Sequence, residues 1–316
     1  MKKMTSLPFL KRKLLKLHQK GMTLIEIMVA VTIMLVVLSA ILYSVASSVA
    51  TGSMQQNLSR MMENGQLALN ILARNIRNSG YQELIAAPNP VQDRDRFGQY
   101  LLGCSASSIS TSTSALPGWG ASCSGTNAND AIAMRFQGGQ LDQLPNLTSG
   151  TTSTGSLDCA GQSVSGSSNE MDRGDGENMT IIDNRFYIHN NTLTCWGNGS
   201  NSALPLVQNI EEMKLWYGVS DKLLDSSGFP TLEGVTKRYM TAAELNSTYS
   251  TETDEERWNR VTAIRICIVV RSADKVGAES YDYKNCSGAT VPGNGDQYLR
   301  RAMFTTVEIS NVASGL

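Results

Sequence analysis

The chain has 316 residues, with 27 basic and 28 acidic side chains that give a net charge of −1 at pH 7. Seven of the basic residues lie within the first 21 positions, so residues 22–316 carry 20 basic and 28 acidic side chains, a net of −8. This acidity argues against a general phosphate-binding surface, so no nucleic-acid partner is predicted. The length allows one large domain or two modest ones.

Residues 1–21 form a basic leader in front of a long apolar run. The leader has no acidic residue, and its basic residues are Lys2, Lys3, Lys11, Arg12, Lys13, Lys16 and Lys20. An ordinary secretory signal is cut after its apolar segment, whereas the small residue Gly21 precedes the segment here. A cut between Gly21 and Met22 therefore leaves the apolar helix in the mature protein. Basic residues beside a span stay in the cytoplasm, so the C-terminal bulk is expected outside.

The apolar run from Met22 to about residue 50 contains one charged residue, Glu26, and the next charge in the sequence is Arg60. About 20 helical residues cross the hydrocarbon layer, so the run predicts a membrane-spanning helix. A carboxylate in such a helix costs roughly 2.5–3.5 kcal/mol on insertion scales and usually has a function. A plain signal anchor with an accidental glutamate is the alternative.

The helical pattern continues beyond the span, and no proline interrupts it before Pro88. We expect one helix over residues 22–80, which spans the membrane to about residue 50 and is amphipathic after it. Gly80 is a fair C-cap. Packing of the amphipathic half on the chain's own sheet is favoured over a coiled coil, because the stripe covers barely three heptads. The apolar stripe consists of Leu58, Met61, Met62, Gly65, Leu69, Leu72 and Ile76.

Residues 81–316 predict a head of mostly antiparallel strands, which together with the first helix gives an α+β fold. Two stretches rich in Ser, Thr, Gly and Asn, residues 104–127 and 146–178, predict long surface loops. Asn190-Asn191 predicts a hairpin turn between two of the strands. The expected strands are residues 131–136, 179–183, 185–189, 193–196, 210–217, 260–271 and 304–309. Short helices are expected near residues 241–245 and 254–258.

All six cysteines follow the apolar run: Cys104, Cys123, Cys159, Cys195, Cys267 and Cys286. An even number confined to the exported part suits disulfide formation in an oxidising compartment. None has the C-x-x-C spacing of a zinc site. Many pairings are possible and the sequence does not choose among them, but we favour the sequential pairs 104–123, 159–195 and 267–286.

The head offers few candidates for chemistry. His189 is the one histidine after the leader, and no nucleophile or orienting acid accompanies it in a motif. We therefore expect no catalytic residue, no enzyme activity and no cofactor. The acidic loop 169–178 is a weak calcium candidate through Asp172, Asp175 and Glu177, but its spacing does not fit an EF-hand loop and a solvated turn is favoured. No other metal site is predicted.

The segment Lys20-Gly-Met-Thr-Leu-Ile-Glu26 resembles the class III signal of type IV prepilins. The resemblance implies that a prepilin peptidase cuts between Gly21 and Met22 and methylates the new amine of Met22. It also implies that Glu26 neutralises the terminal amine of an adjacent subunit in the bilayer, where opposite charges attract far more strongly than in water. Met22 departs from the family pattern, in which phenylalanine is the commoner first mature residue.

Three further segments, residues 63–81, 261–272 and 298–309, resemble minor pilins of the PilW type. That family implies a pilin-like architecture and a minor pilin that co-assembles with other minor pilins and the major pilin. The implied role is to initiate or cap a type IV pilus fibre, in support of pilus biogenesis, adhesion and twitching motility. The expected partners also include the inner-membrane pilus assembly machinery. The expected location is a single pass through the inner membrane with a periplasmic head, followed by the fibre tip at the cell surface.

Three alternatives have different consequences. A type II secretion pseudopilin shares the leader, the helix and the position at a tip, but the large head and the late segments favour the PilW type. A tip adhesin would bind a ligand through its Ser- and Gly-rich loops. A secreted enzyme has no support in the residues.

Overall fold

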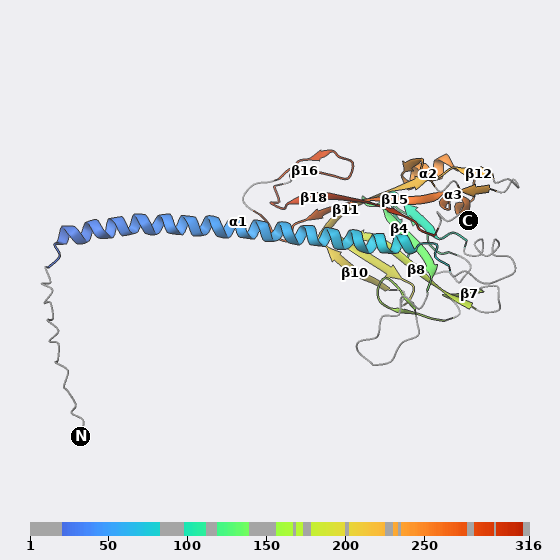
Figure 1. The fold of residues 1–316 in the computed structure, drawn as a ribbon, viewed down its shortest axis with the longest axis horizontal. Helices are drawn as coiled ribbons and strands as arrows, with labels where there is room; N and C mark the ends of the chain where they lie inside the picture. The colour runs from blue at the N-terminus through green and yellow to red at the C-terminus, as the bar shows by residue number, and fades with distance from the viewer. Residues whose placement is uncertain are drawn as a thin grey trace, which may run out of the picture. The chain divides into compact units, whose positions relative to one another are not determined.

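The computed structural model of the protein describes residues 21–82, 98–111, 119–138, 156–166, 169–172, 178–199, 202–224, 230–232, 235–276, 281–293 and 295–311. The chain divides into two compact units, Met1–Gly52 and Ser53–Leu316. Helix α1 (Leu24–Asn78) begins in the first unit and ends in the second (Figure 1). Gly80, with a φ of 71°, follows its last turn and donates its N–H to the carbonyl of Arg135 at 2.9 Å. The helix therefore ends on a left-handed glycine, as expected.

The part of α1 in the first unit exposes its apolar side chains, and α1 is long and apolar enough to cross a membrane. Hydroxyl groups within this part bond to the helix itself. Thr32 donates to the carbonyl of Val29 at 2.8 Å, and Ser39 donates to that of Val36 at 2.8 Å. Ser48 and Thr51 bond in the same way to carbonyls four residues earlier. These hydroxyls need no water, so they add little cost to a helix surrounded by lipid.

The part of α1 in the second unit buries one face against the head. This face consists of Asn57, Met61, Gly65, Ala68, Leu69, Leu72, Ala73 and Ile76. The expected stripe is therefore right in its C-terminal part and wrong at Leu58, which is 40% exposed. Small residues take part in the contact because the helix lies close to the strands. A methyl group added at Gly65 would lie 2.2 Å from Met303 Sδ and 2.9 Å from Val270 Cγ2.

The first sheet has the strand order β1-β4-β8-β9-β10, with β7 paired to β8. Its neighbouring strands are antiparallel, and β8 and β9 form the expected hairpin across Asn190 and Asn191, whose φ angles are 48° and 54°. Two positive φ angles in a two-residue loop match the twist of the strands. The bounds are β1 (Leu101–Cys104), β4 (Ala131–Gln137), β7 (Glu170–Asp172), β8 (Asn178–His189), β9 (Thr192–Gly197) and β10 (Ser202–Gln208).

The second sheet has the order β14-β11-β15-β18 and is also antiparallel. Its strands are β11 (Ile210–Val219), β14 (Arg238–Met240), β15 (Val261–Arg271) and β18 (Arg300–Glu308). Two short helices connect β14 to β15, namely α2 (Ala242–Thr248) and α3 (Asp254–Trp258). Each begins with a capping box, from Thr241 with Glu244 and from Thr253 with Glu256, so both expected helices start where local sequence favours it.

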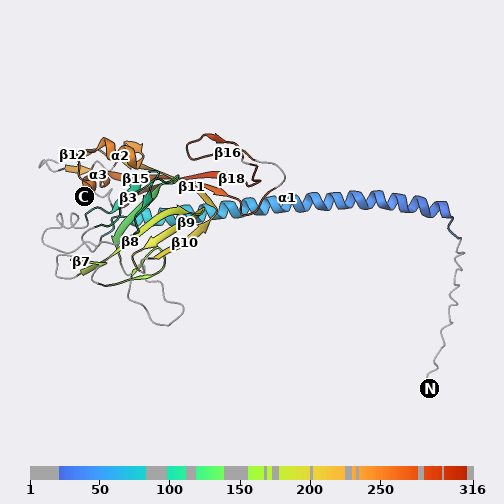
Figure 2. The same cartoon turned by 180° about the vertical axis from the view of Figure 1, so that it is seen from behind.

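The two sheets are joined by side chains at the start of β4. Asn129 Oδ1 accepts from the N–H of Met213 at 2.9 Å, and Asp130 Oδ2 accepts from the N–H of Leu215 at 2.9 Å. Asp130 Oδ1 also accepts from the N–H of Ala106 at 2.8 Å. These bonds satisfy the edge of β11 that does not face β15. The C-terminal half of α1 lies between the two sheets (Figure 2), and one apolar cluster includes residues of all three elements, such as Leu72, Phe186 and Ile266.

The expected α+β class with a long helix on antiparallel sheet is confirmed, and several details differ. Expected strands 179–183 and 185–189 are one strand, β8, because its backbone pairing continues through Asn184. The predicted loop regions 104–127 and 146–178 contain short paired strands wherever the structure describes them. These are β2 (Ser108–Ile109) with β3 (Cys123–Ser124), and β5 (Ser156–Leu157) with β6 (Ser163–Val164), besides β7. Two further pairs are β12 (Lys222–Leu224) with β13 (Pro230–Leu232), and β16 (Tyr283–Lys284) with β17 (Thr290–Val291).

Three disulfides attach three of these short strand pairs, β2–β3, β5–β6 and β16–β17, to the sheets, in the same sequential pairs that we favoured. Cys104–Cys123 joins the end of β1 to β3, with 5.5 Å between the Cα atoms. Cys159–Cys195 joins the turn between β5 and β6 to β9, and Cys267–Cys286 joins β15 to the β16–β17 hairpin. Each bond therefore fixes a segment of two short paired strands to a strand of a sheet.

Candidate functional site

The predicted processing and assembly residues lie at the start of α1. Gly21 and Met22 precede the helix, and the carbonyl of Thr23 accepts from the N–H groups of Glu26 and Ile27 at 3.1 and 3.3 Å. Glu26 therefore belongs to the first helical turn, and its side chain is exposed on the apolar segment. A carboxylate at a helix N-terminus is favoured by the helix dipole, but that effect is small beside the cost of removing it from water.

The described structure around Gly21 does not require a glycine at this position. A methyl group added at Gly21 would meet no heavy atom within 4 Å, and Met22 is 65% exposed. The fold of the described residues therefore does not explain this glycine. Residues 1–20 of the predicted leader lie outside the described residues, so the leader and the domain boundaries remain predictions.

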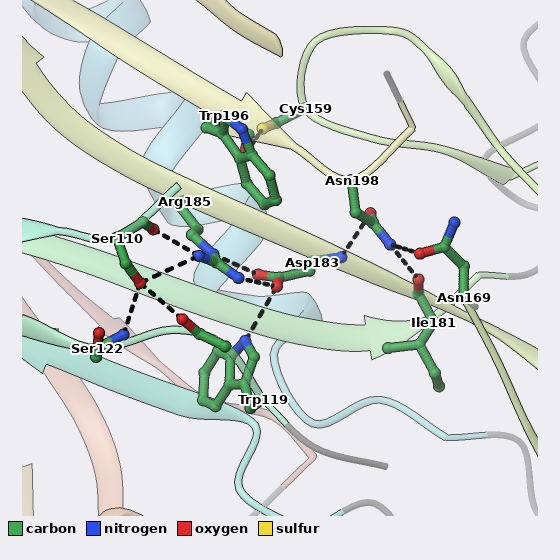
Figure 3. A network of polar contacts seen from close by, with 11 residues as sticks. Ser110, Trp119, Ser122, Cys159, Asn169, Ile181, Asp183, Arg185, Trp196 and Asn198 are labelled. Atoms are coloured by element: carbon green, nitrogen blue, oxygen red, sulfur yellow. Dashed lines mark hydrogen bonds and ion pairs between the residues drawn. The ribbon is translucent and has the colours of Figure 1, made fainter. Parts of the chain in front are cut away.

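The head contains a buried ion pair on the first sheet that the sequence analysis did not single out (Figure 3). Arg185 Nη2 donates to Asp183 Oδ2 at 2.6 Å, and the exposed fractions of the two side chains are 0% and 7%. Trp119 Nε1 donates to the same carboxylate oxygen at 3.1 Å. The guanidinium of Arg185 lies over the ring of Trp196 at 4.4 Å and also bonds to the carbonyl of Ser110.

A second buried arginine faces the same carboxylate. Arg135 on β4 lies opposite Asp183 in the register of the sheet, and its guanidinium lies over the ring of Trp119 at 4.8 Å. Burial lowers the pKa of Arg135 to about 10, and the negative charge of Asp183 opposes that shift. The negative charge of Asp183 thus acts on two guanidinium groups, each of which lies over an indole ring. The arrangement fixes the segment that contains Ser110 and Trp119 onto the sheet, which is a structural task.

The side-chain amide of Asn198 bonds to the backbone of β8 in the way that a neighbouring strand would. Its Oδ1 accepts from the N–H of Asp183 at 3.0 Å, and its Nδ2 donates to the carbonyl of Ile181 at 2.9 Å (Figure 3). The side-chain amide therefore continues the pairing of β8 after β9 ends at Gly197. A sequence signal for the ion pair did exist, because Asp183 and Arg185 are two residues apart and share a face of the strand.

A second charged cluster lies at the start of β18. Arg300 Nε donates to Glu211 Oε2 at 2.6 Å, and Arg300 also pairs with Asp296. Arg271 Nη1 lies 3.4 Å from Glu211 Oε1. The hydrogen bond from Arg300 lowers the pKa of the Asp296 carboxyl to about 2 and raises the pKa of Arg300 above its usual range. This cluster joins β11, β15 and β18 at one end of the second sheet.

The remaining candidates are not brought together. His189 is exposed at the end of β8 and its ring nitrogen lies 3.1 Å from Asn190 Nδ2. Of the calcium candidates, Asp175 and Glu177 and the side chain of Asp172 lie outside the described residues. Within the residues that the structure does describe, no group of three or more His, Cys, Asp or Glu side chains is placed to hold a metal ion. Trp196 and Trp258 are buried, and Trp216 is partly exposed.

Comparison with known proteins found two family models that match parts of this chain. A family model described as prokaryotic N-terminal methylation motif matches residues 16–42, and one described as type IV pilus-assembly protein W matches residues 176–311. A type IV-like pilin from Thermus thermophilus aligns with 80% of this chain and 98% of its own length, at 12% identity and a TM-score of 0.38. No curated protein matches the chain.

The methylation motif at the start of a long apolar helix, followed by an antiparallel head, defines a pilin-like protein. The match of residues 176–311 to one family model defines the class of pilin-like protein more closely. Residues 176–311 match the PilW family of type IV pilus-assembly proteins, and residues 16–42 match the methylation motif. Proteins of this class are structural components, so its role is structural and not enzymatic.

Proposed function

We propose that this protein is a minor pilin, held in the inner membrane by residues 22 to about 50 with its head in the periplasm. A prepilin peptidase removes residues 1–21 and methylates Met22. The protein then co-assembles with other minor pilins and the major pilin, and initiates or caps the fibre. Its contribution to adhesion and twitching motility follows from the presence of that fibre. The inner-membrane assembly machinery is the other partner.

The observation that carries this proposal is the position of Glu26. It lies in the first turn of α1, on an exposed apolar surface, and the next charged residue in the sequence is Arg60. Cleavage before Met22 creates a positive amine four residues away in the sequence. The amine of a neighbouring subunit offsets the cost of the carboxylate only when the two subunits stand in one register. Glu26 thereby couples insertion to the correct alignment of subunits.

The test is the replacement Glu26→Gln in the native pilus-forming host, with Glu63→Gln as the matched control. Glu63 is exposed on the same helix beyond the apolar run, so its replacement removes an equal charge from outside the bilayer. Sheared surface fibres are probed for the protein, and mass spectrometry determines its first residue. We expect Glu26→Gln to stay in the membrane fraction and Glu63→Gln to enter fibres normally.

Two results would contradict the proposal. Entry of Glu26→Gln into fibres at the wild-type level would remove the role of the carboxylate, and a mature chain beginning elsewhere than at methylated Met22 would remove the processing step. Recovery of the wild-type protein with a secretion apparatus instead of a pilus fibre would favour the pseudopilin alternative. Deletion of residues 146–178 that abolishes adhesion while leaving fibres intact would favour a tip adhesin.

A further inference from the structure

Strand β18 forms the edge of the second sheet. Within the described part of the chain it pairs only with β15, in an uninterrupted antiparallel register. Two hydrogen bonds at the ends of this ladder show which opposite residues form hydrogen-bonded pairs. Ile309 N donates to the carbonyl of Thr262 at 2.9 Å, and Ser272 N donates to that of Leu299 at 2.8 Å. Hydrogen-bonded pairs alternate along such a ladder. The backbone N–H and C=O groups of Phe304 and Thr306 therefore point away from β15, toward the open edge.

The other edges of the two sheets are short, interrupted or covered. Strand β10 contains Pro205 and a shift of register beside it, and β1 and β14 have four and three residues. The free part of β11 is capped by the side chains of Asn129 and Asp130. In contrast, β18 has nine residues, no proline and no shift of register, and no charge between Arg301 and Glu308. Proteins normally protect edges of this kind, so an unprotected one indicates a surface that pairs with another chain.

The sheet face beside this edge carries an arginine between two aromatic rings. The guanidinium of Arg265 lies 5.4 Å from the ring centre of Phe304 and 5.9 Å from that of Trp216. Arg265 is exposed, Phe304 is 47% exposed, and the described residues supply no carboxylate to Arg265 within ion-pair distance. The neighbour of Arg265 on β18 is Thr306. Its short side chain leaves room for an acidic side chain to reach the guanidinium from the open edge.

We propose that β18 pairs with an extended segment of a neighbouring subunit, and that an Asp or Glu of this segment, opposite Thr306, binds Arg265. An extended segment of another chain would pair with the outward backbone groups of Phe304 and Thr306 and continue the sheet, which defines the class of partner. Arg265 and the aromatic rings beside it are residue types that dominate protein interfaces. This inference rests on the proposed co-assembly with other pilins and names the surface of the head that takes part in it.

The test compares Thr306→Pro with Thr306→Val in the full-length protein in its native host. Proline removes the outward N–H, whereas valine keeps it and remains a good strand residue. Thr306→Pro loses the hydrogen bond from this N–H to the partner segment and disturbs the neighbouring one, so the amount of protein in sheared fibres should fall about tenfold. Thr306→Val should match the wild type. Formation of the three disulfides and resistance to protease in the membrane fraction show that Thr306→Pro is folded.

A second pair of variants tests the charge. Arg265→Glu is compared with Arg238→Glu, an exposed arginine on β14 of the same sheet. We expect a loss of about tenfold in fibres for Arg265→Glu and none for Arg238→Glu. A photoreactive phenylalanine in place of Glu308 should also form an adduct with an acid-containing extended segment of another pilin.

The outcomes separate the two proposals. Wild-type protein that is absent from fibres overturns the proposed function, and with it this inference. Wild-type protein in fibres, together with folded Thr306→Pro or Arg265→Glu at the same level, overturns only the inference. An adduct from position 308 that maps to a helix, or to a protein other than a pilin, also overturns it.

Discussion

Asp183 shows how much a single carboxylate supports in this head. It accepts hydrogen bonds from Arg185 and Trp119 and lies opposite Arg135, in a region closed to solvent. A buried pair adds little net stability compared with apolar residues, but removing one partner leaves the other charge buried without its counter-charge. The contribution of Asp183 to stability is therefore expected to show mainly when it is removed, because buried guanidinium groups then lack a counter-charge.

We predict that Asp183→Ala lowers the free energy of unfolding by about 3–5 kcal/mol, because two buried guanidinium groups lose the negative charge that faces them both. The matched control is Asp254→Ala. Asp254 pairs with Arg257 but has a side chain that is 72% exposed, so its loss should cost about 1 kcal/mol or less. Urea denaturation of the full-length protein in detergent, with disulfides intact, measures both. Equal costs for the two variants would contradict this account.

Asp296 gives a prediction about pH. Its pKa is lowered from 3.8 to about 2 by hydrogen bonds from Arg300. A carboxyl group with a lowered pKa contributes stability that is fully present above its unfolded pKa and is lost as the pH falls through the folded value. We therefore expect the urea midpoint of the wild type to fall between pH 3.8 and about 2 more steeply than that of Asp296→Asn. Parallel profiles for the two proteins would show that Asp296 is not involved.

At the scale of elements, the contact between α1 and the second sheet depends on Gly65. A methyl group there would lie 2.2 Å from Met303 Sδ and 2.9 Å from Val270 Cγ2, so one of these side chains would have to move. Gly65 belongs to the apolar stripe predicted from the sequence, but the stripe by itself gives no reason for a glycine. The structure supplies that reason, because Met303 and Val270 occupy the space that a side chain at position 65 would need.

Gly65→Ala should accordingly destabilise the head by about 1–3 kcal/mol despite the better helix propensity of alanine. Met303→Ala removes the nearest obstruction, so the double variant should be more stable than the sum of the single effects predicts. Gly52→Ala is the control, because its added methyl meets no heavy atom within 4 Å. Denaturation measurements on the four proteins give the coupling energy. A coupling of zero would mean that helix and strand do not touch at this position.

The elements differ in how far local sequence determines them. The hairpin at Asn190-Asn191 and the capped helices at Thr241 and Thr253 follow from residues within a few positions, and sequence analysis found all three. It missed β10, because Pro205 argues against a strand and is tolerated only at the edge where β10 lies. The two expected strands 179–183 and 185–189 leave a break at Asn184 within β8, because the polar residues 183–185, which include the buried ion pair, interrupt the apolar pattern.

At the scale of the whole molecule, the arrangement of the two sheets depends on residues that are distant in sequence. Asn129 and Asp130 bond to backbone groups of β11 more than 80 positions later. Neither residue type nor spacing marks them, since Asn and Asp before a strand read as part of a turn. The methylation motif at the start of α1 was predictable, because its signal lies in seven consecutive residues. The open edge of β18 was not, because an edge exists only once the order of strands is known.

The joint between the sheets gives the last prediction. Asp130 accepts from the N–H groups of Ala106 and Leu215 through its two oxygens. Asp130→Asn keeps the shape but replaces one oxygen with an NH₂ group that faces an N–H donor. We expect this change to cost about 1–3 kcal/mol of stability, the penalty for leaving a buried backbone donor without an acceptor.

Asp130→Asn weakens the hydrogen bonds that link the two sheets. We therefore expect the two sheets to unfold less cooperatively in this variant. Hydrogen exchange at Leu215 should then become faster relative to exchange in β9, which lies in the first sheet away from the joint. Lys214→Met is the control, because it removes the partly exposed ion pair with Asp130 but keeps both acceptors. If Lys214→Met accelerated exchange at Leu215 as much as Asp130→Asn, the charge of the pair and not the two backbone bonds would hold the sheets together.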